Sequence, residues 1–297
     1  MNKSISTKTL QDLEFSTVLK HVTEYCISSL GREKVLNIEP INNKKYLFKE
    51  LELVNEYASS FESENRVPNH IFDNITASIR RLAIENSFLE TNDFLKIATT
   101  SLTVNELIKF FKKFKTQFPT FYELSQKIEF TTFIDDEIKN VIDISGEVKN
   151  NASPILKQIR KDINNVRGKI GASFSSALSK SMASGYLDEI KETVIDNQRV
   201  LAVSAMHRKK VPGSLLGSSK SGNIVYIAPQ ATLSYSREYQ NLVYDEKQEI
   251  IKILRYLSAT IRPYVFLMEE YITFLIHTDV VGAKAKYAKE INAILPK

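Results

Sequence analysis

The chain of 297 residues contains a single cysteine, Cys26, and only four histidines. One cysteine cannot form an internal disulfide, and alone it cannot provide the ligand set of a zinc site. The histidines show no metal-ligand spacing among themselves or with Cys26. Cys26 falls in an apolar pattern with Leu19, Val22 and Leu30, which favours a packing role over a reactive thiol. The sequence therefore predicts neither a disulfide framework nor a metal site.

Long apolar runs are also missing. The N-terminus has no apolar signal core, and the richest apolar run, residues 264–276, is interrupted by Glu269 and Glu270. That run is too short to span a bilayer. A hydrophobic content of 43% and a charged content of 25% are ordinary for a globular protein. We therefore expect a soluble, cytoplasmic protein without a membrane partner, and the chain length predicts two or more subdomains.

Motifs that carry catalytic chemistry are absent as well. Residues 213–221 look like a phosphate-binding P-loop, but two serines separate Gly217 from Lys220, whereas the lysine of a P-loop follows its glycine directly. The acidic runs 135–137 and 269–270 point neighbouring carboxylates in different directions, which is typical of solvated helix faces. No nucleophile-elbow, Rossmann or zinc-protease pattern occurs. We therefore predict no catalytic residues, so that this chain is not by itself an enzyme.

What the sequence does contain is two long helical patterns on either side of a short segment with strand-like alternation. Apolar residues recur at steps of three and four over residues 153–181 and again over residues 234–261. Each pattern predicts a helix with one buried face. Between them, Asp196, Asn197 and Gln198 predict the turn of a β-hairpin, and residues 224–227 predict a further strand. An antiparallel pair of helices would carry this segment at its far end.

Shorter helical patterns cover the first 130 or so residues, and a further helix is expected after Pro263. One of them covers residues 15–30 and meets Gly31, a common helix stop. The predicted fold is mainly α, a helical core with long antiparallel helices that carry a small β-containing tip. The predicted division is residues 1–150 for the first part of the core, 151–192 for the outgoing helix, 193–233 for the tip, 234–262 for the returning helix and 263–297 for the last part of the core.

Positive charge is the main chemical feature of the predicted tip. The whole chain has 40 Lys and Arg against 35 Asp and Glu, a mild excess of +5, but residues 199–220 contain no carboxylate. A short basic run is often only solvated surface, and a loop of Gly and Ser is often only a flexible hairpin. A place at a projecting tip makes contact with a polyanion an equal alternative. The candidate phosphate ligands are Arg199, Arg208, Lys209, Lys210, Ser219 and Lys220.

Four blocks, kept in order over nearly the whole chain, carry a family resemblance. They are residues 13–19 with Leu30, Gly31 and Pro40; residues 145–154; the group of residues 199–203, 211–213, 219–222 and 227–229; and residues 283–288. In these blocks the chain resembles the MutS-II subfamily, MutS-like ATPases that lack the N-terminal mismatch-recognition domain. It departs from the family at Gln198, where a glycine is common, and at Gly217-Ser218, where an acidic residue followed by glutamine is common.

The resemblance implies that the two long helices are levers and that the segment between them is a clamp that approaches nucleic acid. It implies a non-catalytic module of a homodimeric protein, acting on branched or duplex DNA in recombination control, or on the ribosomal RNA of stalled ribosomes. Arg199, Arg208, Lys209, Lys210, Ser219 and Lys220 would then contact phosphates. The rival interpretation is a helical coiled-coil scaffold or dimerisation module that does not contact nucleic acid.

The resemblance also implies what other parts of such proteins contain. Family members continue into an ABC-type ATPase domain that uses ATP and Mg²⁺, often followed by a nuclease-like Smr domain. The chain stops at Pro296 and Lys297, where we expect that ATPase to begin. The chain therefore looks like an N-terminal fragment with no cofactor of its own.

Overall fold

The computed structural model describes residues 5–296, and the chain in it forms two compact units. The helical unit comprises Met1–Lys149 and Leu254–Lys297, and the inserted unit comprises Asn150–Ile253. The chain is 63% helical and has a small four-stranded antiparallel sheet. These proportions confirm the predicted mainly α class.

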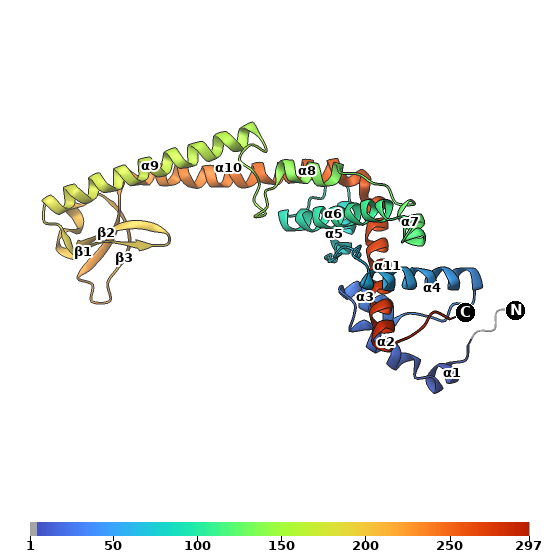
Figure 1. The fold of residues 1–297 in the computed structure, drawn as a ribbon. Helices are drawn as coiled ribbons and strands as arrows, with labels where there is room; N and C mark the ends of the chain where they lie inside the picture. Colours follow the sequence, from blue (N-terminus) through green and yellow to red (C-terminus); the bar gives the residue numbers. More distant parts are fainter. Residues whose placement is uncertain (1–4, 297) are drawn as a thin grey trace. The chain divides into compact units, whose positions relative to one another are not determined.

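The helical unit is built around its last helix, α11 (Val265–Glu290), which is drawn in red in Figure 1. Leu267, Met268, Val280 and Val281 are all buried, and they are distributed around the circumference of α11. A helix that is apolar around its circumference needs neighbours on several sides. Within residues 5–296 no helix is long and apolar enough to cross a membrane. The other elements of the unit are α1 (Thr7–Asp12), α2 (Phe15–Thr23), α3 (Ser29–Leu36), α4 (Lys44–Ser59), η1 (Ser60–Glu62), α5 (Thr76–Leu82), α6 (Thr91–Lys113), α7 (Pro119–Ser125), α8 (Phe133–Val141), the end of α10 (Gln230–Ile261) and η3 (Arg262–Tyr264).

Cys26 lies in the core of the helical unit, beside Leu19, Val22 and Val35. Burial raises the pKa of its thiol to about 12. A thiol with so high a pKa carries almost no thiolate at neutral pH, and the thiolate is the reactive form. Cys26 is therefore a packing residue, as the sequence predicted.

The segment predicted to be one helix over residues 15–30 is two helices. α2 ends at Thr23, and α3 begins after Ser28, whose Oγ accepts a hydrogen bond from the backbone N–H of Gly31 at 2.9 Å. Gly31 therefore lies inside α3 and does not stop a helix. Its role is to allow the close approach of Asp279, a buried residue of α11.

The inserted unit is an antiparallel pair of long helices with a four-stranded sheet at one end (Figure 1). Its two helices are α9 (Pro154–Ala183) and the part of α10 up to Ile253. Residues progressively later in α9 contact residues progressively earlier in α10, so the two helices are antiparallel. The pairs are Ser153 with Glu249 at 2.7 Å, Arg160 with Glu246 at 2.7 Å, Arg167 with Tyr239 at 2.9 Å and Ser173 with the carbonyl of Ala231 at 2.9 Å.

The sheet has the strand order β1-β2-β4-β3, and every neighbouring pair is antiparallel. Its strands are β1 (Leu187–Ile195), β2 (Gln198–Ser204), β3 (Gly213–Ser218) and β4 (Ile224–Pro229), with the short helix η2 (Ala205–Lys210) between β2 and β3. Asp196 and Asn197 turn from β1 into β2 with positive φ angles, which confirms the predicted hairpin turn. One core holds the sheet against α9, formed by Phe174, Leu201, Val203, Val211, Val225 and Ile227.

The outgoing helix matches its apolar pattern over residues 153–181, whereas the starts of the first strand and of the returning helix differ from the prediction. α9 ends at Ala183, because Gly185 adopts a left-handed conformation (φ 66°) that stops it. β1 then begins at Leu187, before the predicted start of the β-containing segment at residue 193. The returning helix begins at Gln230, directly after Pro229 ends β4, and not at residue 234.

Candidate nucleic-acid interface

All six residues predicted to contact phosphates lie in the inserted unit, on or beside its sheet. Arg199 is on β2, the run Arg208–Lys210 is on η2, and Ser219 and Lys220 are in the turn between β3 and β4. The five cations are exposed to solvent, whereas Ser219 is half-buried.

The first residue of η2 lies at the same end of the sheet as the β3–β4 turn. The carbonyl of Tyr186 accepts a hydrogen bond from the N–H of Ser204, the last residue of β2, and the next residue, Ala205, donates to the carbonyl of Asn223. The centroids of the Tyr186 and His207 rings are 5.1 Å apart, and the Nζ of Lys210 lies 5.5 Å from the centroid of the Tyr186 ring. The start of η2 and the β3–β4 turn therefore lie together at the end of β2, and the side chain of Lys210 contacts Tyr186.

Arg199 lies at the opposite end of β2, paired with Val194 in the β1–β2 hairpin. Its guanidinium donates to Oε2 of Glu192 at 2.6 Å and lies 4.2 Å from the centroid of the Phe174 ring. Phe174 is a fully buried core residue of α9. Arg199 thus joins the β1–β2 hairpin to α9, with only part of its hydrogen-bonding capacity directed to solvent.

Ser219 closes the β3–β4 turn with its own hydrogen bonds. Its Oγ accepts from the N–H of Ile224 at 3.1 Å, and its N–H donates to the carbonyl of Ile224 at 2.9 Å. Its carbonyl accepts from the N–H of Gly222, which adopts a positive φ of 72°. The consequence is a defined turn with Lys220 exposed at its tip.

Much of the positive charge of the inserted unit lies outside the predicted six residues. The inserted unit has 15 Lys and Arg against 9 Asp and Glu, a formal charge of +6, whereas the helical unit has 25 against 26, a formal charge of −1. The excess positive charge of the chain is therefore confined to the inserted unit. Summing charge by structural unit, instead of along a local run, would have revealed this distribution from the sequence.

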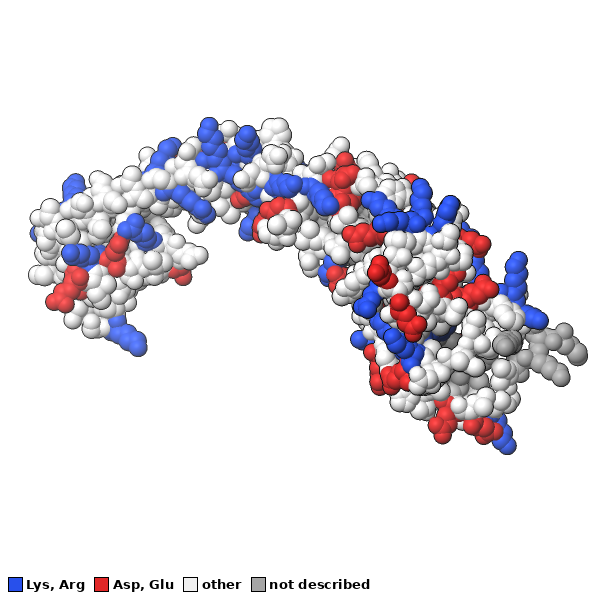
Figure 2. Space-filling view, viewed as in Figure 1, with Lys and Arg blue, Asp and Glu red and all other residues white. Residues whose placement is uncertain are grey.

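Helix α9 carries a large share of this charge, with six Lys and Arg and a single acid, Asp162. Lys and Arg side chains gather along α9 in Figure 2. Three of the cations contact α10: Arg160 pairs with Glu246, the guanidinium of Arg167 lies 5.3 Å from the centroid of the Tyr239 ring, and the Nζ of Lys169 lies 5.8 Å from the centroid of the Tyr235 ring. The others, including Lys157, Lys161 and Lys180, are exposed.

Comparison with known proteins finds similarity to proteins named MutS2, in agreement with the resemblance carried by the sequence blocks. No family model matches the chain. Over 97% of its length the chain is 29% identical to endonuclease MutS2 of Pelotomaculum thermopropionicum and 28% identical to endonuclease MutS2 of Bacillus velezensis. Over 98% of its length it is 28% identical to endonuclease MutS2 of Lactobacillus helveticus.

The match is to a part of these proteins, because the chain spans 37% of the length of each of the three relatives. The resemblance seen in the sequence is confirmed at that level: the chain matches a partial region of MutS2-type proteins. The name of the relatives, endonuclease, describes those longer proteins.

Proposed function

We propose that the inserted unit is the nucleic-acid-binding clamp of a MutS2-type protein, and that α9 and α10 are the levers that carry it. The observation that supports this most directly is the confinement of the net positive charge to this unit. Phosphate contacts supply most of the sequence-independent affinity for nucleic acid, and they need exposed Lys and Arg.

In this proposal the central contacts come from Arg208, Lys209, Lys210 and Lys220. These four are exposed, and none of them makes an ion pair with any residue that the structure describes. Arg199 is already bound to Glu192, so we assign it a smaller contribution. Ser219 would act by fixing the turn that presents Lys220.

The ligand in this proposal is a phosphate backbone, in duplex or branched DNA or in ribosomal RNA. The protein would act in the cytoplasm as a homodimer. Any use of ATP and Mg²⁺, and any nuclease activity, is assigned to the parts of MutS2-type proteins that this chain does not match. The clamp itself would be non-catalytic.

The test compares the salt dependence of binding between two triple variants with the same change of charge. Arg208→Gln/Lys209→Gln/Lys210→Gln alters the proposed interface, and Lys112→Gln/Lys113→Gln/Lys115→Gln alters exposed cations of the helical unit. Fluorescence anisotropy would follow a duplex and a four-way junction, and sedimentation would follow ribosomes. For duplex DNA, the slope of log affinity against log salt should become less negative by about 0.9 for each lost phosphate contact, up to about 2.7 for the first variant. Equal effects of the two variants on every ligand would contradict the assignment.

The second candidate function is a scaffold in which the long helices bind only protein. It is favoured by the continuous contacts between α9 and α10, which need no nucleic acid. Light scattering coupled to size exclusion separates the two functions. Self-association with no binding of DNA or ribosomes at low salt would support the scaffold and refute the clamp.

A further inference from the structure

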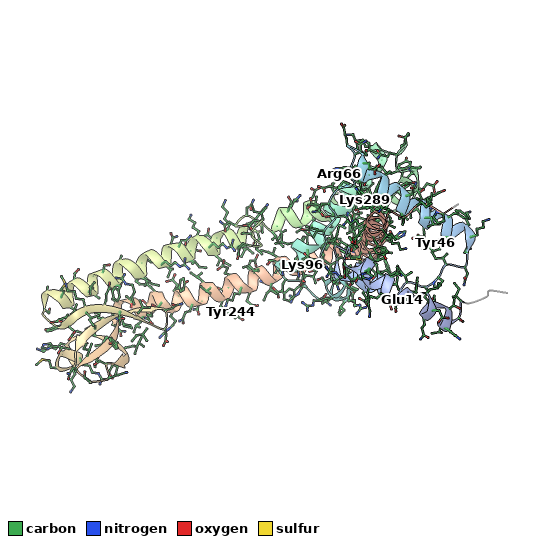
Figure 3. The ribbon with its side chains drawn as sticks, turned by 60° about the horizontal axis from the view of Figure 1, so that its bottom comes forward. Glu14, Tyr46, Arg66, Lys96, Tyr244 and Lys289 are labelled. Carbon is green, nitrogen blue, oxygen red and sulfur yellow. The ribbon has the colours of Figure 1, made fainter. Side chains whose placement is uncertain are left out.

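A small pocket in the helical unit is lined almost entirely by cations. Its volume is about 290 Å³, and its lining consists of Phe61, Arg66, Lys286 and Lys289. Phe61 belongs to η1, and Arg66 follows it in the loop before α5, whereas the two lysines are one turn apart near the end of α11. Figure 3 shows Arg66 and Lys289 close together, although they are far apart in the sequence.

The three cations of this pocket have no counter-ion among residues 5–296. None of them forms an ion pair with a described carboxylate. The Nζ of Lys286 donates to the carbonyl of Tyr25 at 3.4 Å, and the Nζ of Lys289 lies 5.2 Å from the centroid of the Phe61 ring. These contacts orient the lysines, and neither partner is a carboxylate.

Acidic residues lie near these cations in the sequence but do not line the pocket. Glu62 and Glu64 flank the loop that carries Arg66, and Glu290 follows Lys289. Three positive charges that face one concavity repel one another, and the most direct relief is a bound anion. The folded helical unit thus holds a preformed cationic recess, although its overall charge is slightly negative.

We propose that this pocket binds a phosphate group. Arginine offers a planar fork that matches two phosphate oxygens, and lysines add mobile point charges. The pocket has several times the roughly 30 Å³ that one water molecule occupies in the liquid, so it has room for a phosphate group and its hydration. The phosphate would come from a nucleic-acid backbone or from a free nucleotide. This inference does not depend on the proposed clamp, because it uses none of the residues of the inserted unit.

The first test is calorimetric titration of the folded protein with pyrophosphate at low salt. The variant Arg66→Gln/Lys289→Gln removes two of the three charges and keeps Lys286, which also contacts Tyr25. The control, Lys112→Gln/Lys113→Gln, removes two exposed charges from α6. We expect saturable binding by the wild type and the control, and binding at least about tenfold weaker by the pocket variant, a difference of one decade in Kd. Since Arg66 is an exposed loop residue, Arg66→Gln alone provides a second variant with little effect on folding.

The second test identifies the source of the phosphate by competition with the bound pyrophosphate. Its two competitors are AMP and a short duplex without terminal phosphates, used in the Arg208→Gln/Lys209→Gln/Lys210→Gln background to suppress binding by the inserted unit. Competition by AMP alone assigns a free nucleotide, and competition by the duplex assigns a backbone phosphate. No saturable binding of pyrophosphate by the wild type, or the same affinity in the pocket variant and the control, would overturn the proposal.

Discussion

Replacement of Gly31 by alanine tests whether helix propensity or a single close contact governs this position. Gly31 lies in the first turn of α3 and is buried. A Cβ atom at this position would lie 2.1 Å from Oδ2 and 2.8 Å from Cγ of Asp279. Real Cβ atoms do not approach other heavy atoms so closely, so either the carboxylate or α3 must move.

The Asp279 carboxylate is held in place by three hydrogen bonds. Its Oδ1 accepts from the N–H of Ile27 at 2.8 Å, and its Oδ2 accepts from the N–H of Ser28 at 2.9 Å and from Ser28 Oγ at 2.6 Å. Asp279 is only 1% exposed, so water cannot replace a partner that is lost. Movement of the carboxylate therefore leaves a buried charge with fewer hydrogen bonds.

The two effects of the alanine differ in size and in sign. Alanine in place of glycine in a helix stabilises it by about 1 kcal/mol. Hydrogen bonds to a charged group contribute about 1.5–3 kcal/mol each, and loss of the partner of a buried charge costs about 3–5 kcal/mol. We expect a net destabilisation of about 2–4 kcal/mol for Gly31→Ala. For a domain of this size, the corresponding fall in Tm is about 4–16 °C.

The assay is thermal and urea unfolding of four proteins: the wild type, Gly31→Ala, Asp279→Ala and the double variant. Alanine at position 279 removes the atoms that block the Cβ, so Gly31→Ala should be nearly neutral in that background. Gly168→Ala in α9 is the reference for propensity, because its Cβ would meet nothing within 4 Å, and it should stabilise by up to about 1 kcal/mol. If Gly31→Ala stabilises like Gly168→Ala, or costs the same with and without Asp279, the close-contact explanation is wrong.

Two further predictions concern one residue in each unit. Gly213→Ala should destabilise the sheet by about 1–3 kcal/mol, because its Cβ would lie 2.1 Å from the carbonyl oxygen of Ala228. The backbone amides of β4 should then exchange hydrogen faster. Unchanged exchange rates would contradict this prediction. Burial raises the pKa of Glu50, but the hydrogen bond and charge of His277 and the charge of Lys284 outweigh burial and hold it below the ordinary 4.5. A carboxyl group whose pKa is lower in the folded than in the unfolded protein stabilises the fold at pH values above its unfolded pKa. This stabilisation is lost as the pH falls through the folded pKa. Glu50→Gln should therefore lower the urea midpoint at pH 7 and have little effect at pH 3, and an equal loss at both values would refute the linkage.

Gly31 also shows where prediction from sequence fails in the helical unit. A glycine after an apolar helical pattern usually marks the end of the helix, and the prediction followed that rule. The contact that requires glycine here comes from Asp279, at the other end of the chain. A local pattern cannot distinguish a helix stop from a close approach, because the second depends on a partner that only the fold supplies.

In the inserted unit, the elements that were predicted correctly depend on local chemistry. The β1–β2 turn follows from Asp196 and Asn197, which tolerate positive φ angles. The first half of β1 was missed because it is an edge strand with Asp188, Glu189 and Lys191, which do not alternate with apolar residues. Charged edge strands are common in sheets because charge discourages pairing with another chain. Their polar sequence hides them from a search for apolar alternation.

In the candidate interface, too, some features could be predicted from the sequence and others could not. Charged residues can be identified from the sequence, so the cations of η2 and of the β3–β4 turn could be predicted. The partners of Arg199 could not, since Glu192 and Phe174 meet it only when the hairpin packs on α9. The function of these residues in binding stays a prediction until the paired triple variants are measured.

The structure of α9 sets the scale of the proposed complex with nucleic acid. Arg160, Arg167 and Lys169 contact α10, and Lys157, Lys161 and Lys180 are exposed. The stretch from Lys157 to Lys180 is about 35 Å long at about 1.5 Å per residue. Duplex DNA rises about 3.4 Å per base pair, so this length corresponds to about 10 base pairs. Since the sheet adds its own cations at one end of α9, a clamp of this design would contact phosphates both at the sheet and along the helix that carries it.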